Sequence, residues 1–316
     1  MAPKSHWASK KERGSVYGIQ FLLFLYTVFG KLVFNIVLTP VMVYFYLTGR
    51  SARQAIWQFF DNLDAHQNLP KKTFFAKFVA GFKLFFSFGL AIVDKFDAWL
   101  GKVKFEDIDL ISDEHYKELS SGKGGIILSG HLGNMEVCRA VFSQEKHKRP
   151  LNIITYIDHA KSFNKILKSL DPDSYVNFIH IDQFGPDDSI RLKQKVENGE
   201  LIVIFADRIS VNNPNSANYV PFLGKDAAFP IGPFALASVM ECPIFTIFCL
   251  KEKGRYKAYI EKLSDTVKVA RKDRNAYFIK LTERFSLQLE KYVKMAPYQW
   301  YNFFDFWQKD QDSSKK

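Results

Sequence analysis

The stretch GGIILSGHLGNMEVCRAV (124–141) contains both kinds of element on which the fold is predicted to rest. Its first part, GGIILSG (124–130), is a short apolar run, which favours a buried strand. A helix is predicted to follow near residues 133–144. His131 therefore lies where the chain is expected to change from strand to helix.

The same alternation of short apolar runs and polar helical segments extends through the chain from residue 101. The other predicted strands are LNIITYI (151–157), YVNFIHI (175–181), LIVIFAD (201–207) and PIFTIFCL (243–250). The other predicted helices lie near 160–170, 187–198, 231–241 and 272–294. This order predicts an α/β fold with a largely parallel central sheet flanked by helices. Because such sheets bind ligands beyond the carboxyl ends of their strands, the site is expected in loops 129–136, 158–160 and 207–230.

The amino-terminal region is apolar over a long distance. IQFLLFLYTVFG (19–30) and LVFNIVLTPVMVYFYL (32–47), separated by Lys31, together exceed the ~20 residues that a spanning helix needs. The length of this predicted helix (about 17–48) and its internal Lys31 argue against a cleaved signal peptide. Basic residues flank it on both sides, and Lys31 and Pro40 are places where it could break. A bent or re-entrant element with both ends in the cytoplasm is therefore favoured, while a single span and a buried core hairpin stay open.

A second apolar stretch, TFFAKFVAGFKLFFSFGLAIVDKFDAWL (73–100), carries phenylalanines at helical spacing and is interrupted by lysines. This pattern suits an interfacial helix whose lysines reach lipid headgroups, and it suits a Phe-rich core helix equally well. The predicted organisation is a membrane-associated helical region (1–100), a catalytic domain (101–307) and a polar tail (308–316).

The formal net charge of +11 suits a polyanionic or acidic partner. We find no nucleic-acid-binding module, so an anionic membrane surface or an acidic carrier protein is expected instead of nucleic acid. A basic surface that only improves solubility remains an alternative. The three cysteines, Cys138, Cys242 and Cys249, lie among apolar neighbours and are expected to be buried, reduced thiols, as in a cytosolic domain.

The predicted chemistry centres on His131 and Glu136. Two side chains five positions apart do not share one helical face, so His131 is expected just before the helix and Glu136 one turn inside it. The carboxylate could then hold one imidazole nitrogen and leave the other as a general base. Free N–H groups of Gly133 and Asn134 could stabilise the oxyanion of an acyl-transfer intermediate. Ser129 is a nearby alternative nucleophile, although it lacks the GxSxG elbow.

HLGNMEV (131–137) resembles the HLGNWE-type signature of the bacterial lipid A late acyltransferases, within the wider glycerolipid and lysophospholipid acyltransferase superfamily. Two further blocks are similar to that family. The segment 205–245 resembles its Asp-Gln or Asp-Arg pair followed by a Val-Pro-Phe-Phe-Gly sequence. APYQWYNFFDFW (296–307) resembles its closing Pro-x-Gln-Trp segment. The likeness extends over roughly residues 120–307.

The resemblance implies an acyltransferase of the bacterial inner membrane, with its catalytic domain on the cytoplasmic face. It implies an acyl carrier protein or acyl-coenzyme A thioester as donor, and a hydroxyl or amine of a membrane lipid or glycolipid as acceptor. No metal or organic cofactor is required. The implied roles are a base, its partner, two loop residues beside the acyl carbonyl and two residues at the pocket mouth: His131, Glu136, Gly133, Asn134, Asp207 and Arg208.

One block departs from the family pattern. Lipid A enzymes typically continue from Gln-Trp into Phe-His-Arg-Arg, whereas this chain has Asn302, Phe303, Phe304 and Asp305. A dibasic pair suits phosphorylated saccharide acceptors. Its loss makes the chain look more like acyltransferases of aryl-polyene-type lipids or of other non-phosphorylated lipids.

Two other function classes remain open. A membrane-associated, metal-dependent glycosyltransferase could use Asp107-x-Asp109 or Asp171-x-Asp173 to hold a metal-nucleotide. A non-catalytic membrane scaffold could keep the fold without its chemistry. A manganese requirement would favour the first, and an unchanged phenotype in His131→Ala would favour the second.

Overall fold

The computed structural model describes residues 16–142, 149–155, 176–180, 185–209 and 216–307. The helices are α1 (Val16–Thr48), α2 (Arg50–His66), α3 (Phe74–Trp99), α4 (Asp113–Leu119), α5 (Met135–Phe142), α7 (Pro186–Glu197), α8 (Gly232–Met240) and α9 (Arg274–Met295). The strands are β1 (Ile108–Ile111), β2 (Gly125–Ser129), β3 (Leu151–Thr155), β4 (Val176–His180), β5 (Leu201–Phe205), β6 (Ala217–Phe222), β7 (Lys225–Pro230), β8 (Ile244–Glu252) and β9 (Arg255–Ser264).

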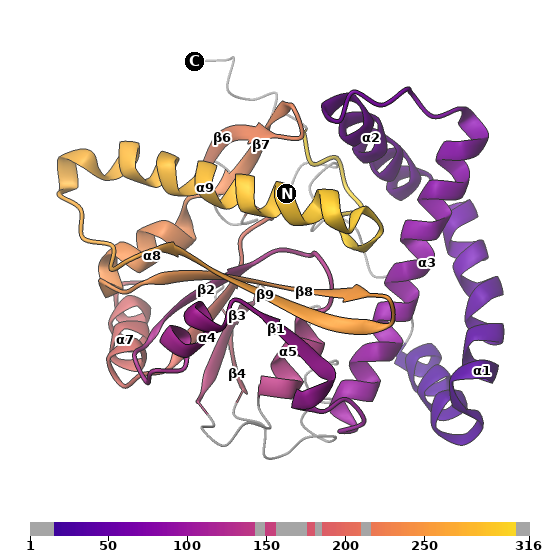
Figure 1. Ribbon diagram of the computed structural model, residues 1–316, viewed down its shortest axis with the longest axis horizontal. Helices are drawn as coiled ribbons and strands as arrows, with labels where there is room; N and C mark the ends of the chain where they lie inside the picture. Colours follow the sequence, from indigo (N-terminus) through magenta and orange to yellow (C-terminus); the bar gives the residue numbers. More distant parts are fainter. Residues whose placement is uncertain (1–15, 143–148, 156–175, 181–184, 210–215, 308–316) are drawn as a thin grey trace.

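A seven-stranded sheet forms the centre of the molecule, in the order β1-β9-β8-β2-β5-β3-β4 (Figure 1). β8, β2, β5, β3 and β4 run parallel to one another, and the hairpin from β8 to β9 reverses the direction at one side. β1 then pairs parallel with β9. The carboxyl ends of β2 and β5 consequently lie side by side, with Ser129 in register with Phe205. The predicted α/β fold with a largely parallel sheet is confirmed.

The two faces of the sheet bury two different cores, because successive strand residues point to opposite sides. Ile126 and Leu128 of β2 pack in the core covered by α2, α7, α8 and α9. Ile127, between them, packs in the second core against α4, α5 and the end of α3. β2 is fully buried as a result, which explains why its sequence is continuously apolar.

The amino-terminal helices form a layered flank, with α3 between α1 and the sheet (Figure 1). α1 runs antiparallel along α3. Tyr46 contacts Phe78 near one end of this pairing, and Met42 lies against Gly89, where a Cβ would come within 3.0 Å of the methionine sulfur. Near the other end the Tyr26 hydroxyl donates to Asp97. α1 therefore contacts α3 over most of its described length.

Lys31, the charge inside the apolar stretch, has a structural role. Its ammonium lies 3.2 Å from a carboxylate oxygen of Asp94 on α3, and Asp94 also accepts from Lys251 and Tyr256, each at 2.6 Å. Asp94 is 5% exposed, and burial opposes its ionisation, but these donors hold its pKa below the ordinary value. This network ties α1 and the central sheet to one buried carboxylate on α3.

Several details differ from the expectations. α1 breaks at Gly30, where φ is 76°, and not at Lys31 or Pro40, because glycine adopts this backbone conformation without strain. α2, β1, β9 and the β6–β7 hairpin had not been predicted; the hairpin lies inside the predicted 207–230 loop. The predicted helix at 160–170 and loop at 158–160 lie outside the described residues. The three cysteines are buried and free, as predicted.

Candidate active site

The loop after β2 is built around two glycines. A Cβ on Gly130 would come within 3.2 Å of a carboxylate oxygen of Asp207 and 3.0 Å of the Leu289 side chain. Gly133 has a φ of +71°, and a Cβ there would lie only 2.0 Å from the Cys249 carbonyl oxygen. Gly133 therefore allows a close approach that no other residue could make, and at Gly130 a larger residue would push against the side chains of Asp207 and Leu289. They bring His131 against the end of β5, where Asp207 follows.

His131 and Asp207 form the central contact of the site. The Nδ1 atom of His131 lies 2.7 Å from Oδ1 of Asp207, and the backbone N–H of His131 donates to Oδ2 at 2.8 Å. Asp207 is completely buried, while the side chain of His131 keeps 30% of its surface exposed. A carboxylate that accepts from Nδ1–H leaves Nε2 as the unprotonated, basic nitrogen.

Two further side chains surround the carboxylate. The Asn302 amide donates to Oδ2 of Asp207 at 2.9 Å, and the same amide's oxygen accepts from Nε of Arg208 at 3.1 Å. Arg208 also donates to the Tyr301 carbonyl, and its guanidinium lies 5.7 Å from the ring centre of Phe304. The carboxylate thus lies in a buried polar network, whose donors offset the cost of burying its charge.

The electrostatics favour a neutral imidazole next to an ionised carboxylate. Burial and the positive charge of Arg208 lower the pKa of His131, and the Asp207 carboxylate only partly offsets them. Burial would raise the pKa of Asp207, but the His131 and Arg208 contacts hold it well below its usual range. Burial lowers the pKa of Arg208 to about 10, so its guanidinium stays charged at neutral pH. His131 is therefore unprotonated and basic under ordinary conditions.

Glu136 does not make the predicted contact with His131. Its carboxylate instead accepts from Nε of Arg139, one turn further along α5, at 2.9 Å. It also acts electrostatically on Lys95 of α3. The physical reason is that α5 begins only at Met135, which turns Glu136 toward the second core while the chain from β5 brings Asp207 to the imidazole. Asp207, predicted at the pocket mouth, holds the position that had been predicted for Glu136.

The backbone N–H groups of Gly133 and Asn134 are not free oxyanion donors. Gly133 donates to the Gln299 carbonyl and Asn134 to the Cys249 carbonyl, each at 2.8 Å. The Asn134 side chain is buried and donates to the Ala91 carbonyl of α3. Both residues therefore hold the loop in place, and their N–H groups are not the free donors that had been expected.

Ser129 is also unsuited to the alternative role of nucleophile. Its side chain is fully buried, and its hydroxyl donates to the Ile247 carbonyl of β8 at 2.7 Å. A nucleophilic serine needs a basic partner and access to substrate. Among the described residues the basic group that faces outward at this loop is His131.

The carboxyl-terminal segment contributes a residue that the sequence did not single out as functional. Tyr301 N–H donates to the His131 carbonyl at 2.7 Å, which places Asn302 against Asp207 and Arg208. Asn302 was noted only as a departure from the family pattern. The signal available in the sequence was its position two residues after Trp300 of the Gln-Trp pair.

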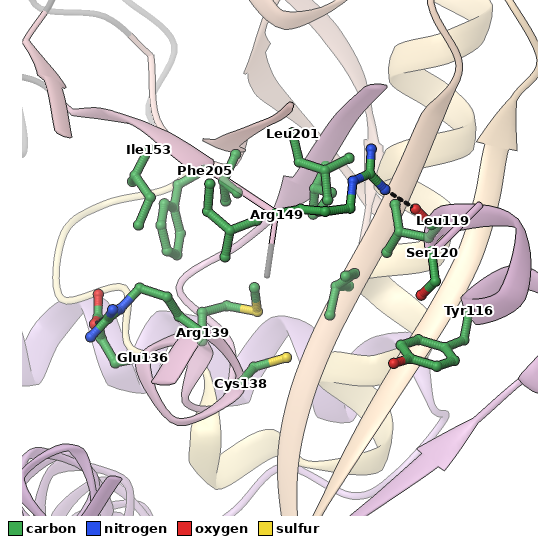
Figure 2. A pocket seen from close by; sticks show the side chains of 15 residues that line it. Tyr116, Leu119, Ser120, Glu136, Cys138, Arg139, Arg149, Ile153, Leu201 and Phe205 are labelled. Atoms are coloured by element: carbon green, nitrogen blue, oxygen red, sulfur yellow. Dashed lines mark hydrogen bonds and ion pairs between the residues drawn. The ribbon is translucent and has the colours of Figure 1, made fainter. Parts of the chain in front are cut away.

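An apolar cavity of about 240 Å³ lies against the second face of the sheet, between α4, α5 and the strand side chains (Figure 2). Phe205, which packs against the His131 ring at a centroid distance of 5.1 Å, lines it, and so does Glu136. Most of the remaining lining is aliphatic: Leu119, Ile127, Met135, Leu151, Ile153, Leu201, Val203 and Ile247. The cavity therefore adjoins the imidazole and is separated from it by one aromatic ring.

Of the residues suggested for a metal-nucleotide, the described pair, Asp107 and Asp109, does not form a metal site. Asp107 accepts the Lys104 backbone N–H, and Asp109 accepts from Arg255 at the outer edge of the sheet. Within the described part of the chain, no group of three or more potential His, Cys, Asp or Glu ligands lies close enough to hold a metal. Asp171 and Asp173 lie outside the described residues.

The comparisons with known proteins agree with the three sequence blocks. The family model described as bacterial lipid A biosynthesis acyltransferase matches residues 12–309. No curated protein matches the chain.

Proposed function

This chain belongs to the bacterial lipid A biosynthesis acyltransferase family, and on that premise we propose that it moves a fatty acyl group from a thioester to a membrane lipid. The donor is acyl carrier protein or acyl-coenzyme A, and the acceptor is a hydroxyl or amine. The observation that carries the proposal is the His131–Asp207 contact of 2.7 Å at the carboxyl edge of the sheet. It supplies the base that such a transfer needs.

In the proposed mechanism, Nε2 of His131 takes the proton of the acceptor hydroxyl or amine as its oxygen or nitrogen attacks the thioester carbonyl. Asp207 keeps Nδ1–H oriented and stabilises the imidazolium that forms. The tetrahedral intermediate then collapses, the carbon–sulfur bond breaks, and the imidazolium returns its proton to the departing thiolate. Arg208, whose charge already acts on His131, is the proposed stabiliser of the oxyanion.

The apolar cavity is the proposed site of the donor's acyl chain. Its aliphatic lining suits a hydrocarbon chain, and Phe205 connects it to the imidazole. A chain held there would present its thioester next to Nε2. The formal net charge of +11 would favour association with the acidic carrier protein or an anionic bilayer.

The acceptor is proposed to be a lipid without phosphate at the reacting end. Where lipid A enzymes typically have a dibasic pair, this chain has Phe304 and Asp305, and Phe304 packs against Arg208. An aromatic ring in that place favours an apolar or uncharged group over a phosphate. An aryl-polyene-type lipid remains one candidate within this class.

The amino-terminal flank is the proposed membrane attachment. Phe24–Thr48 and Phe74–Ala98 are long and apolar enough to cross a bilayer. Within the most apolar 18 residues of each helix, only 17% and 33% are buried. Leu32 and Ile36 of α1 are 75% and 64% exposed, and Phe75 at the start of α3 is 74% exposed. Large apolar side chains exposed on long apolar helices are typical of lipid contact.

We propose further that α1 lies in the plane of one leaflet. The stretch of α3 that contacts α1 also contacts the catalytic domain. The hydroxyl groups of Ser87 and Tyr301 are hydrogen-bonded at 3.1 Å, and Asp94 accepts hydrogen bonds from Lys251 and Tyr256. A helix is only about 10 Å wide. An α1 that crossed the bilayer would therefore pull this polar domain into the hydrocarbon, at a high cost in desolvation.

A labelling experiment tests this orientation. Single cysteines at Ser5 and Ser313 are reacted with a membrane-impermeant maleimide in spheroplasts, since the native thiols are buried. An in-plane α1 predicts that both positions react only after the membrane is opened. Labelling of one end in intact spheroplasts would show that α1 spans the bilayer.

Comparative lipid mass spectrometry tests the function. Cells with His131→Ala are expected to accumulate a lipid that is lighter by one acyl group than the product in wild-type cells. His115→Ala, on α4 but outside the His131 loop and the cavity lining, is the matched control and should keep the wild-type profile. Identical lipid profiles in wild type and His131→Ala, with both proteins present in the membrane, would refute the proposed acyl transfer.

A further inference from the structure

The edge of β8 that faces β2 loses its strand neighbour part of the way along. β2 pairs with β8 only as far as Leu128, opposite Thr246, whereas β8 continues well beyond that point. Alternate residues of a strand direct their backbone groups to the same side. Beyond Thr246 the residues that face this side are Ile247, Cys249 and Lys251. Their backbone groups need other partners, because a buried backbone group without one is costly.

The loop after β2 and the carboxyl-terminal segment supply these partners. The Ser129 hydroxyl donates to the carbonyl of the first residue at 2.7 Å, and the Asn134 N–H donates to that of the second at 2.8 Å. At Lys251 the partner is the side-chain amide of Gln299. The amide oxygen accepts from the Lys251 N–H, and the amide nitrogen donates to the Lys251 carbonyl, each at 2.9 Å. One side chain thus satisfies both backbone groups, as a neighbouring strand would.

The backbone of Gln299 holds the His131 loop at the same time. Its carbonyl accepts from the Gly133 N–H at 2.8 Å, and two residues later the Tyr301 N–H donates to the His131 carbonyl at 2.7 Å. The residues between these two bonds face each other in an antiparallel bridge. The position of residues 299–301 therefore sets where the backbone of His131 lies.

The Gln299 amide is distinct from the apolar anchor of this segment. Trp300 is 1% exposed and packs against Phe59 of α2 and Phe222 of β6, at ring-centroid distances of 5.0 and 5.3 Å. These contacts would keep the segment folded onto the domain if the amide were lost, because large aromatic side chains dominate the energy of such packing. The amide adds a fixed position along β8, and hence a fixed position of the loop that carries His131.

We propose that Gln299 is a positioning residue for the acyl transfer, which fixes the His131 loop and Asn302 against the end of β8 so that the imidazole meets Asp207 in the catalytic geometry. This inference rests on the proposed function, because it takes His131 to be the base. The Gln299 side chain binds Lys251 and does not line the apolar cavity, so it acts on the chemical step and not on donor binding. A displacement of about 1 Å in a catalytic group can lower a rate by about a hundredfold.

The test compares two variants of the full-length protein in detergent, Gln299→Met and Gln288→Met. Both keep the size of the side chain and remove an amide that makes two hydrogen bonds. Gln288, on α9, is the matched control, because its amide accepts from Thr246 at 2.9 Å and donates to Glu261 at 3.0 Å, outside the His131 loop. In Gln299→Met kcat should fall by about tenfold to hundredfold, while KM stays within about twofold. Gln288→Met should keep the wild-type kcat.

Amide hydrogen exchange, measured by mass spectrometry, reports on the loop without catalysis. Gln299→Met should speed exchange in peptides that cover 130–134 and 299–302 and leave the β6–β7 hairpin as protected as in wild type. Gln299→Asn keeps an amide that is one methylene too short to reach Lys251, and it should show the same two effects. It replaces Gln299→Met if the apolar substitution prevents folding.

A folded Gln299→Met enzyme with the wild-type kcat, or with unchanged exchange at 130–134, would overturn the proposal. A loss of kcat in Gln288→Met as large as that in Gln299→Met would also overturn it, because the effect would then not depend on the loop. If wild type transfers no acyl group, the proposed function fails, and the exchange result alone decides whether Gln299 positions the loop.

Discussion

The carboxylates of Glu136 and Asp207 both lie near the loop after β2, yet they have different partners. Asp207 is completely buried and holds both the ring and the backbone of His131. Glu136 is tied to Arg139 and lines the apolar cavity. In the proposed mechanism Asp207 therefore supports the proton transfer, whereas Glu136 forms part of the wall of the proposed acyl pocket. The difference shows that the register of neighbouring strands predicts the hydrogen-bond partner of His131 better than spacing along the chain does.

The largest loss of activity is expected from Asp207→Asn. An amide cannot stabilise an imidazolium or enforce the Nδ1–H tautomer, so kcat should fall by about 10² to 10⁴, the range for losing general-base catalysis. The measurement is acyl transfer in detergent, with circular dichroism as a check on folding. Asp97→Asn, on α3, is the control carboxylate and should retain most of the activity. A folded Asp207→Asn enzyme with near-normal kcat would show that Asp207 does not support His131.

A smaller effect is expected from Glu136→Gln. The amide keeps the size of the side chain and can still accept from Arg139, so kcat should fall by no more than about tenfold. The measurement is kcat and KM with one acyl-coenzyme A donor. A loss in Glu136→Gln as large as that in Asp207→Asn would restore the originally predicted His131–Glu136 pairing and undo the distinction between the two carboxylates.

The smallest effect is a displacement of the pH profile. Burial and Arg208 lower the pKa of His131, so the imidazole stays neutral to a more acidic pH, and the acid limb of kcat/KM should lie below 6.5, the ordinary value. Because Asp207 raises this pKa, the residual activity of Asp207→Asn should have its acid limb at still lower pH. In Glu136→Gln the limb should stay where it is in wild type. A limb that moves only in Glu136→Gln would contradict the assignment.

Much of the fold could be predicted because a strand that is buried on both faces has a continuously apolar sequence. The apolar runs at 124–130 and 201–207 contain β2 and β5, and the helix predicted at 272–294 is α9 within two residues. The hairpin of β6 and β7 was missed because it has no long apolar run: β6 buries only Val220 and Phe222, and β7 begins with the exposed Lys225 and Asp226. β9 was missed because Lys257, Glu261 and Lys262 interrupt its apolar pattern while pairing with neighbours.

The sequence by itself determined the class of the protein. Three ordered blocks identified an acyltransferase family and placed His131 at a strand-to-helix junction, since local glycines and apolar runs are visible without any tertiary contact. Only the tertiary structure decided that Asp207, 76 positions away, holds the imidazole, and that Glu136 belongs to a buried ion pair at the cavity. The reason is that hydrogen-bond partners are fixed by strand register and helix phase, and both depend on contacts between segments far apart in the chain.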